Sequence, residues 1–204
     1  MMSDQLRRRG ITHEGVLEAF SAVPRERFVP PERRHEAYED RPIPIGRGQT
    51  ISQPYVVALM LEELDPKETD RVLDVGAGSG YQTALLARLV AHVYAIERID
   101  VLAERAMAAL ADVGAVNVTM KVGDGSLGWP EEAPFDGIIC GAGAPHVPKA
   151  WESQLADGGR IVLPIGQAGA QSLVVLEKAG RKFHRRRICD VRFVKLIGKH
   201  AWPE

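Results

Sequence analysis

The order of apolar and polar residues divides the chain into an irregular first third and a regularly patterned remainder. Apolar positions at helical spacing predict a helix over residues 12–22, with Thr12 as its N-terminal cap. Residues 41–52 contain two prolines and two glycines, which predicts an ordered loop rather than a helix or a strand. A second helix is expected from Pro54, because proline is well suited to the first turn of a helix.

From Arg71 onward, short apolar runs alternate with segments of helical periodicity. The expected strands cover residues 72–75, 92–96, 116–122, 135–140 and 159–165, and the expected helices cover 81–90, 101–113 and 147–155. Two further strands, 172–178 and 188–197, follow without a helix between them and are expected to pair antiparallel. This alternation predicts an α/β fold, in which helices cover both faces of a doubly wound, mainly parallel sheet.

The length of 204 residues is sufficient for one sizeable α/β domain but too short for two. We therefore expect a single domain over residues 1–204, with an N-terminal helical extension (1–64) and a core (65–204). The net charge is −1, whereas a general nucleic-acid binder carries a basic excess that offsets phosphate charge. The sequence contains only two cysteines, and its N-terminus does not resemble a signal peptide, so we expect a cytoplasmic protein. No apolar run is long enough to span a membrane, so we expect no membrane partner. The oligomeric state is open, and a monomer is favoured.

A glycine-rich segment lies where the first strand of the core ends. Gly76, Gly78 and Gly80 stand two apart between an expected strand and an expected helix. Glycines let the backbone turn sharply and let a ligand approach without a Cβ in the way. A nicotinamide-binding loop has its third glycine three positions after the second, and that position is Tyr81 here. The spacing disfavours a dehydrogenase, and a plain strand-to-helix turn is the alternative to a ligand-binding loop.

Two acidic residues follow at the ends of the next two expected strands. Glu97 comes 21 residues after Gly76, and a carboxylate there suits hydrogen bonds from ribose hydroxyls. Asp124 lies between Gly123 and Gly125, where it is placed to accept from an adenine amino group while Gly125 leaves room for the ring. Asp-Gly is also common in ordinary turns. Because successive strand ends of a parallel sheet meet at one edge, the three features together favour S-adenosylmethionine as a bound cofactor.

Several motifs resemble those of one known family, the protein-L-isoaspartate O-methyltransferases. Residues 74–83 (DVGAGSGYQT) resemble the first methyltransferase motif in the form of that family, which includes Tyr81 and Gln82. Residues 45–54 (IGRGQTISQP) resemble its substrate loop, which is far more specific than the glycine motif. The resemblance runs from about Gly10 to the C-terminus, and further matching segments follow in order at 123–126, 133–138, 154–160, 163–166 and 193–198.

The resemblance implies an enzyme, a protein-L-isoaspartate(D-aspartate) O-methyltransferase that acts on damaged proteins and peptides. Such an enzyme transfers the methyl group of S-adenosylmethionine to the free α-carboxylate of an L-isoaspartyl residue. The methyl ester then cyclises without the enzyme to a succinimide, which partly hydrolyses to normal aspartate. A carboxylate is already ionised at neutral pH, so this chemistry requires positioning and water exclusion rather than a strong base or a metal ion.

The same resemblance assigns roles to individual residues. Ser52 is the expected catalytic residue, whose hydroxyl donates to the substrate carboxylate; the alternative, which is compatible with this role, is that Ser52 caps the helix that opens at Pro54. Thr50, Ile51 and Gln53 are expected to bind the substrate beside Ser52. The expected cofactor-binding residues are Asp74, Gly76, Ala77, Gly78, Ser79, Gly80, Glu97, Arg98, Gly123, Asp124 and Gly125.

Two departures from the family pattern are expected to lie at the rim of the site and therefore to bear on substrate preference. Lys195 stands where bacterial relatives commonly have proline, and residues 141–144 (GAGA) are richer in glycine than usual. Two other functions compete with repair: a related methyltransferase acting on a small molecule or nucleic acid, and a non-catalytic cofactor-binding scaffold. The basic run 181–187 is expected to form a solvated hairpin between two strands rather than a nucleic-acid site. None of the six histidines stands at metal-ligand spacing.

Overall fold

The computed structural model describes residues 2–203, with side chains from residue 4 to residue 203. The strands are β1 (Ile43–Gly46), β2 (Gln49–Ile51), β3 (Arg71–Val75), β4 (His92–Glu97), β5 (Val118–Val122), β6 (Phe135–Cys140), β7 (Leu155–Gln167), β8 (Ala170–Ala179) and β9 (Lys182–Val191). The α-helices are α1 (Met2–Arg8), α2 (Glu14–Ala22), α3 (Pro54–Leu64), α4 (Tyr81–Ala87), α5 (Asp100–Asp112) and α6 (Lys149–Gln154). The 3-10 helices are η1 (Arg25–Phe28), η2 (Pro31–Glu36), η3 (Gly125–Leu127) and η4 (Pro130–Glu132).

Strands β3 to β9 form one sheet in the order β5-β4-β3-β6-β7-β8-β9. The strands from β5 across to β7 run parallel, whereas β8 and β9 pair antiparallel at one edge. The chain moves outward from β3 through β4 to β5, and then returns to the other side of β3 with β6. Such sheets bind ligands at the carboxyl ends of the strands beside this reversal. The predicted mainly parallel sheet with antiparallel C-terminal strands is confirmed.

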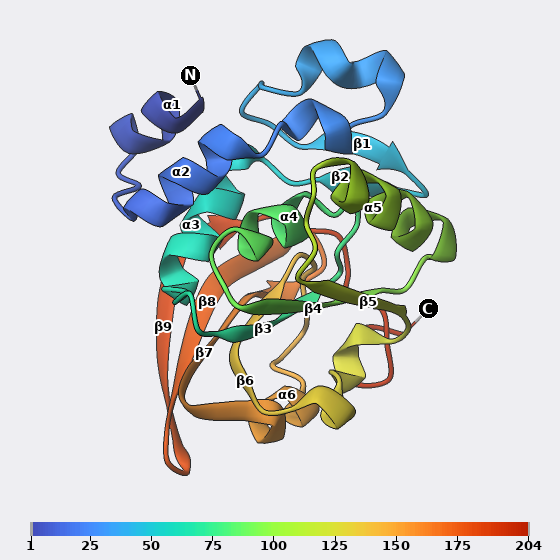
Figure 1. Cartoon of the computed structure of the whole chain (residues 1–204). Helices are drawn as coiled ribbons and strands as arrows, with labels where there is room; N and C mark the ends of the chain where they lie inside the picture. Colours follow the sequence, from blue (N-terminus) through green and yellow to red (C-terminus); the bar gives the residue numbers. More distant parts are fainter. Residues whose placement is uncertain (1, 204) are drawn as a thin grey trace.

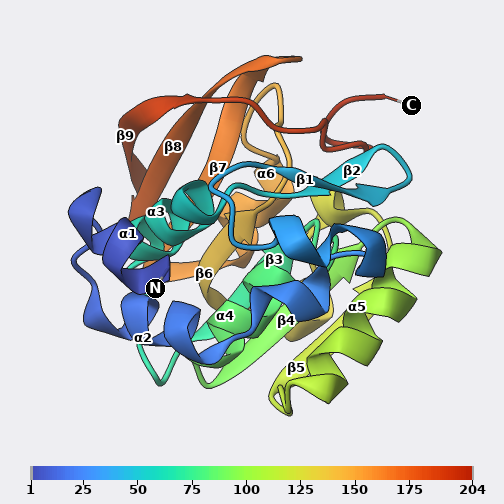
Figure 2. The ribbon, with the colours of Figure 1, turned by 90° about the horizontal axis from the view of Figure 1, so that it is seen from above.

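Helices cover the two faces of the sheet unequally (Figures 1 and 2). Helices α2 to α5 lie on one face, and α6 with the 3-10 helices η3 and η4 lies on the other. Alternate side chains of β3 point to opposite faces. Val72 belongs to the hydrophobic cluster under α2 to α5, whereas Leu73 and Val75 belong to the cluster on the α6 side. The sheet is therefore buried on both faces, as a parallel sheet requires.

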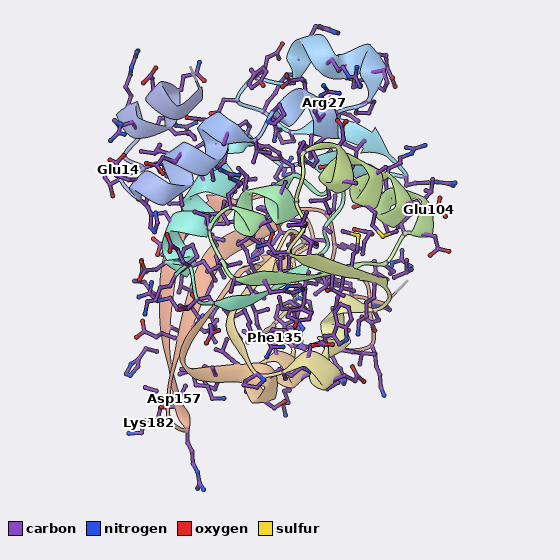
Figure 3. All side chains as sticks on the ribbon, in the orientation of Figure 1. Glu14, Arg27, Glu104, Phe135, Asp157 and Lys182 are labelled. Atoms are coloured by element: carbon purple, nitrogen blue, oxygen red, sulfur yellow. The ribbon has the colours of Figure 1, made fainter. Side chains whose placement is uncertain are left out.

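Aromatic side chains fill the layer on the α6 side. Phe135 is fully buried, and its ring centre lies 5.6 Å from that of Tyr94, which in turn lies 5.7 Å from Trp129. Figure 3 shows Phe135 inside this layer, whereas Glu14 and Glu104 extend from the outer surfaces of α2 and α5. Charged side chains on the outer faces of α2 and α5 thus lie toward solvent, whereas this layer under the sheet is largely apolar.

The N-terminal extension packs directly on the core helices. The rings of Phe20 and Phe28 lie 5.8 Å and 5.5 Å from the ring of Tyr81, at the start of α4. Leu6 and Leu17 join the same hydrophobic cluster as the core residues on this face of the sheet. This packing carries the extension over the carboxyl edge of the sheet.

The segment 41–52 contains a β-hairpin, so the prediction of a loop without strands is wrong. Strands β1 and β2 pair antiparallel with Ile43 opposite Ile51, and both side chains are buried. Gly46 and Gly48 have φ values of 96° and 70°, which a side chain would disfavour. The glycines that indicated a loop instead serve the tight reversal between two short strands.

The last strand also differs from the prediction of residues 188–197. Ala179 pairs with Lys182, so β8 and β9 join in a tight turn at Gly180. The basic run therefore lies almost entirely on β9 and not between two strands. Charged residues suit this position because an edge strand exposes one side to solvent. Residues 192–202, which we call the C-terminal segment, then cross the carboxyl ends of the strands.

Thr12 is not the cap of α2, contrary to the prediction. The ring Nδ1 of His13 accepts from the N–H of Val16 at 3.3 Å, which makes His13 the cap. The N–H and the hydroxyl of Thr12 both donate to Glu62 of α3, at 2.6 Å and 2.9 Å. Thr12 thus hydrogen-bonds to a residue 50 positions away instead of capping the helix. Capping preferences consider only neighbouring residues, so they could not predict this partner.

We expect a methyl group on Gly125 to destabilise the protein. A Cβ on Gly125 would overlap the buried Val75 side chain, whereas a Cβ on Gly123 would meet no atom within 4 Å. Gly125→Ala should lower the free energy of unfolding by about 1–3 kcal/mol through overpacking, and Gly123→Ala should change it by less than about 0.5 kcal/mol. Urea unfolding measures both, and equal stabilities of the two variants would contradict this packing.

Candidate active site

The loop between β3 and α4 lies at the carboxyl edge of the sheet. Gly76, Gly78 and Gly80 have φ values of 77°, 57° and 84°, a region of conformation that favours glycine. The N–H of Gly76 donates to the carbonyl of Ile96 at 2.8 Å, which anchors the loop to β4. A Cβ on Gly80 would lie 3.1 Å from the Cβ of Ala106 on α5. The glycines therefore let the backbone turn from strand to helix in the small space beside β4 and α5.

Glu97, the last residue of β4, braces this glycine loop from the side. Its Oε2 accepts from the N–H of Gly78 at 2.8 Å, and its Oε1 accepts from the N–H of Ile99 at 2.9 Å. The residue is only 6% exposed. Each carboxylate oxygen keeps a further lone pair, so Glu97 can hold the loop and still accept from a ligand hydroxyl.

Asp74 supports the same loop from within the protein. Its Oδ1 accepts from Gln82 Nε2 at 2.7 Å, and its Oδ2 accepts from Thr83 Oγ1 at 2.6 Å. Complete burial raises the pKa of Asp74 to about 6, although these two hydrogen bonds oppose the increase. Asp74 thus joins the end of β3 to the first turn of α4. Direct contact between Asp74 and a cofactor stays a prediction.

A pocket, here called the cofactor pocket, opens between the glycine loop and the C-terminal segment. Six of the predicted cofactor-binding residues line it, namely Gly76, Gly78, Glu97, Arg98, Gly123 and Gly125. Ala77 and Ser79 face a smaller adjoining pocket instead. The sequence did not indicate Ile99, Val194, Leu196 or Ile197 as pocket residues, whereas Lys195 and Ala142 belong to the two departures from the family pattern. The signal for the wall formed by residues 194–197 was the family-like motif at 193–198, in which Lys195 alone was expected to bear on the site.

Asp124 is held to the C-terminal segment. Its Oδ1 accepts from the N–H and the hydroxyl of Ser126 at 2.8 Å and 2.7 Å, and its Oδ2 accepts from the N–H of Lys199 at 2.8 Å. Partial burial raises the pKa of Asp124, but the hydrogen bonds from Lys199 and Ser126 outweigh it, so the pKa lies below its usual value. These bonds leave Asp124 limited capacity to accept further hydrogen bonds. The expected contact with adenine stays a prediction.

Lys195 lies in the wall of the cofactor pocket. Its ammonium group lies 5.5 Å from the centre of the Trp202 ring, within the distance of a cation–π contact. The residue that departs from the family pattern therefore lies at the rim of the site, as the sequence predicted.

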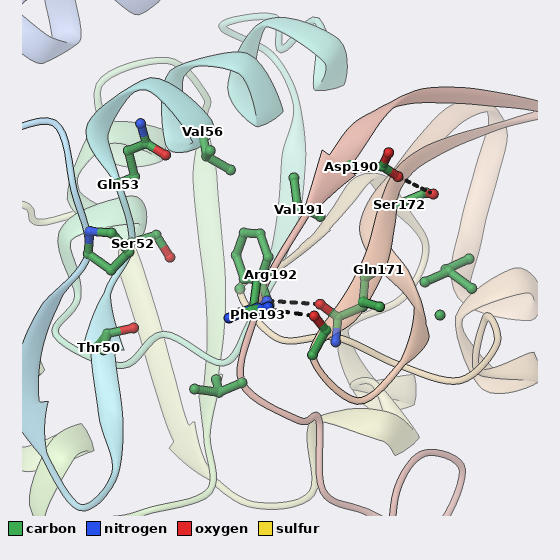
Figure 4. A pocket seen from close by; sticks show the side chains of 17 residues that line it. Thr50, Ser52, Gln53, Val56, Gln171, Ser172, Asp190, Val191, Arg192 and Phe193 are labelled. Carbon is green, nitrogen blue, oxygen red and sulfur yellow. Dashed lines mark hydrogen bonds between the residues drawn. The ribbon is translucent and has the colours of Figure 1, made fainter.

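A cleft of about 730 Å³ adjoins the cofactor pocket (Figure 4). The predicted substrate residues Thr50, Ser52 and Gln53 line one side of it. Ile51 is buried and faces the smaller pocket instead. Thr50 and Gly141 line the cofactor pocket, the smaller pocket and the cleft alike. The three hollows therefore meet beside these two residues.

Ser52 does not cap helix α3, so that alternative is wrong. The N-cap residue is Gln53, and the N–H of Tyr55 in the first turn donates to Asp40 Oδ1 at 3.1 Å. Figure 4 shows the Ser52 hydroxyl pointing into the cleft, across from Phe193. The side chain is thereby placed to meet a ligand in the cleft.

Gln171 holds the opposite wall and was missed by the sequence analysis. Its Oε1 accepts from the N–H of Phe193 at 2.9 Å, and its Nε2 donates to the carbonyl of Gln167 at 3.0 Å. A Cβ on Gly143 would lie 3.0 Å from the Gln171 side chain, so glycine lets the two segments approach closely. A single glutamine at the start of a strand forms no pattern by which this role could be predicted.

Neither metal ligation nor thiol chemistry is indicated at the site. Among the side chains described, no three His, Cys, Asp or Glu residues come together as a metal ion would require. Burial raises the pKa of Cys140 to about 12, and burial also raises the pKa of Cys189, so both stay protonated thiols at neutral pH. A separate finding is that no helix within residues 2–203 is long and apolar enough to cross a membrane.

The burial of Asp74 predicts a defined pH dependence of stability. Its folded pKa of about 6 exceeds the unfolded value of 3.8, so its contribution to stability falls as the pH rises from about 4 to 6. Asp74→Asn removes this titration. Relative to the parent, the variant should gain on the order of 2–3 kcal/mol of unfolding free energy between pH 4 and pH 7. Urea unfolding at both pH values tests this, with Asp157→Asn on the surface as the control. A pH-independent difference would refute it.

Comparison with known proteins assigns the chain to one family. The profile of the family Protein-L-isoaspartate(D-aspartate) O-methyltransferase (PCMT) matches residues 1–201. The chain is 52% identical over 202 residues to a protein-L-isoaspartate O-methyltransferase of Methanoregula boonei, covering 99% of this chain and 93% of that one. It is 53% identical over 205 residues to protein-L-isoaspartate O-methyltransferase 2 of Marinobacter nauticus, covering 100% and 94%.

Solved structures agree with this assignment. A protein-L-isoaspartate O-methyltransferase superimposes with a TM-score of 0.87 at 29% identity, covering 98% of this chain and 66% of that longer chain. A Plasmodium falciparum chain, described as a beta-aspartate methyltransferase and solved with S-adenosyl-L-homocysteine, superimposes with a TM-score of 0.85 at 27% identity, covering 96% of both chains. The match of the family profile along almost the whole chain settles the question raised by the motifs: this chain belongs to the protein-L-isoaspartate(D-aspartate) O-methyltransferase family.

Proposed function

We propose that this enzyme uses S-adenosylmethionine to methylate the free α-carboxylate of L-isoaspartyl residues in damaged proteins and peptides. The ester then cyclises to a succinimide, which begins repair to aspartate. The observation that carries the proposal is the meeting of three hollows at Thr50 and Gly141. A methyl donor in the cofactor pocket and a carboxylate in the cleft would meet there, and reaction by direct transfer needs such proximity.

The residues of the cofactor pocket fit S-adenosylmethionine. Glu97 is a buried acceptor suited to ribose hydroxyls, and Gly76 and Gly78 let the backbone approach the ligand. The space beside Gly123 is open, since a Cβ there would meet no atom within 4 Å, and a flat base would fit beside it. The cofactor supplies a methyl carbon made electrophilic by the sulfonium. The Plasmodium relative solved with S-adenosyl-L-homocysteine supports this choice.

Ser52 is proposed as the catalytic residue. Its hydroxyl lines the cleft next to Thr50 and would donate to one oxygen of the substrate carboxylate, which fixes the other for attack. A carboxylate is ionised at neutral pH, so no proton has to be removed. Thr50 and Gln53 would hold the peptide beside it. The C-terminal segment, through residues 194–197, covers the cofactor pocket and helps to exclude water from the reaction.

Proteins and peptides are the proposed substrates, in preference to nucleic acids. Two of the three arginines of β9 are paired with carboxylates: Arg186 Nη1 donates to Glu63 Oε1 at 3.1 Å, and Arg187 Nη2 donates to Asp190 Oδ1 at 2.5 Å. Paired cations attract phosphates less than free ones do. We also propose that the enzyme works as a monomer in the cytoplasm; its two free thiols are in keeping with a reducing compartment.

We expect methyl transfer to depend on the isoaspartyl linkage. Incubation with methyl-labelled S-adenosylmethionine and two peptides that differ only in an aspartyl or isoaspartyl residue measures this directly. Base-labile label should appear on the isoaspartyl peptide alone, because a methyl ester hydrolyses in base. Label on added RNA, or label on neither peptide, would refute the proposed function.

Ser52→Ala should slow turnover without abolishing peptide binding. Loss of one positioning hydrogen bond raises the barrier by roughly 1–3 kcal/mol, which corresponds to about a 5- to 150-fold lower kcat. Ser153→Ala is a matched control, since its hydroxyl donates to the carbonyl of Ala150 on the surface of α6. Steady-state kinetics with the isoaspartyl peptide compare the two variants. A Ser52→Ala enzyme as fast as the control would remove Ser52 from the mechanism.

A further inference from the structure

Arg25, the first residue of η1, is a fully buried cation behind the cleft. Its Nη2 donates to the backbone carbonyl of Ser52 at 2.7 Å, and its Nε donates to the carbonyl of Ala37 at 2.8 Å. Its guanidinium carbon lies 4.8 Å from the ring centre of Tyr81, which directly follows the glycine loop. The Arg25 side chain therefore contacts both Ser52, in the predicted substrate loop, and α4, the helix that begins at the glycine loop.

Apolar packing alone does not explain an arginine at this position. Burial lowers the pKa of Arg25 to about 10, which still leaves the guanidinium charged at neutral pH. Its Nη1 is buried without a hydrogen-bond partner, an arrangement that is itself unfavourable. An apolar side chain of similar volume would fill the space without burying a charge. What only the guanidinium supplies is a rigid set of donors, directed at two carbonyls.

A hydrogen bond to the carbonyl of Ser52 can fix the position of the Ser52 hydroxyl. The backbone of Ser52 lies between the end of the short strand β2 and the start of α3, outside both elements. A rotation of the peptide at this point would swing the hydroxyl within the cleft. Displacements of about 1 Å in a reacting group lower rates by about 100-fold.

We propose that Arg25 is a positioning residue for methyl transfer, which holds the Ser52 carbonyl so that the Ser52 hydroxyl meets the substrate carboxylate. The inference rests on the proposed role of Ser52. Arg25 lines neither the cleft nor the cofactor pocket, so it acts through Ser52 and not on the substrate. Its contact with Tyr81 ties this position to the glycine loop.

The test compares two changes at Arg25 with a control in the same 3-10 helix. Arg25→Lys keeps the charge but loses the planar fork, and Arg25→Met keeps most of the volume but no donor. Arg27→Met is the control, because Arg27 is exposed and pairs with Asp112 at 3.1 Å. We expect Arg25→Lys to lower kcat for an isoaspartyl peptide by about 10- to 100-fold. The dissociation constant of S-adenosyl-L-homocysteine, measured by calorimetry, should change by less than about threefold. Arg27→Met should match the parent in both.

A double variant separates positioning from a structural role. If Arg25 acts through Ser52, Arg25→Lys should slow the Ser52→Ala enzyme by less than about threefold, because the hydroxyl it positions is already absent. Multiplying losses would overturn the inference, as would full kcat in Arg25→Lys. The inference would also be overturned if Arg25→Lys weakened the binding of S-adenosyl-L-homocysteine by the same factor as it lowered kcat. This outcome does not depend on whether Arg25→Met folds. The Ser52→Ala enzyme by itself tests the proposed role of Ser52. Normal turnover of Ser52→Ala would refute the roles proposed for both Ser52 and Arg25. Slow turnover of Ser52→Ala together with normal turnover of Arg25→Lys would refute only the role proposed for Arg25.

Discussion

Two buried carboxylates hold the glycine loop, and the geometry of the whole site depends on that loop. Removing a carboxylate from water is unfavourable unless its oxygens receive hydrogen bonds. Asp74 receives them from Gln82 and Thr83 on α4, and Glu97 receives one from the N–H of Gly78 in the loop itself. The need to satisfy these oxygens therefore restricts a segment that its glycines would otherwise leave free in conformation. The cofactor pocket is lined by the backbone of this loop, so the loop's position sets the pocket's shape.

The two ends of the chain complete the site from opposite sides. The N-terminal extension brings the hairpin of β1 and β2 over the carboxyl edge of the sheet, followed by Ser52. The antiparallel strands β8 and β9 return the chain to the same edge, where the C-terminal segment covers the cofactor pocket. Polar side chains fasten these additions: Gln171 binds the N–H of Phe193, and Asp124 binds the N–H of Lys199. The parallel core thus provides a place for the methyl donor, and the additions form the cleft beside it.

The reaction proposed for this site requires no strong base from the protein. The nucleophile arrives ionised, so the protein's task is to place a carboxylate against a methyl group and to exclude water. Placement of that kind depends on backbone segments that do not shift. Hydrogen bonds from buried side chains to backbone groups recur around the site for this reason. Arg25 on the carbonyl of Ser52 is the instance closest to the proposed chemistry.

The sequence by itself determined the α/β alternation, the mainly parallel sheet and the edge of the sheet at which the glycine loop and Glu97 come together. Apolar periodicity and glycine spacing are local properties, and parallel strands place their carboxyl ends together, so these conclusions need no knowledge of distant contacts. Only the tertiary structure decided that residues 43–51 form a hairpin, that Asp124 binds the C-terminal segment, and that Gln171 and Arg25 support the cleft. Each of these depends on a partner that is distant in sequence or on burial against the rest of the fold. A buried polar side chain binds whichever backbone group the fold brings to it, and no local pattern specifies that group.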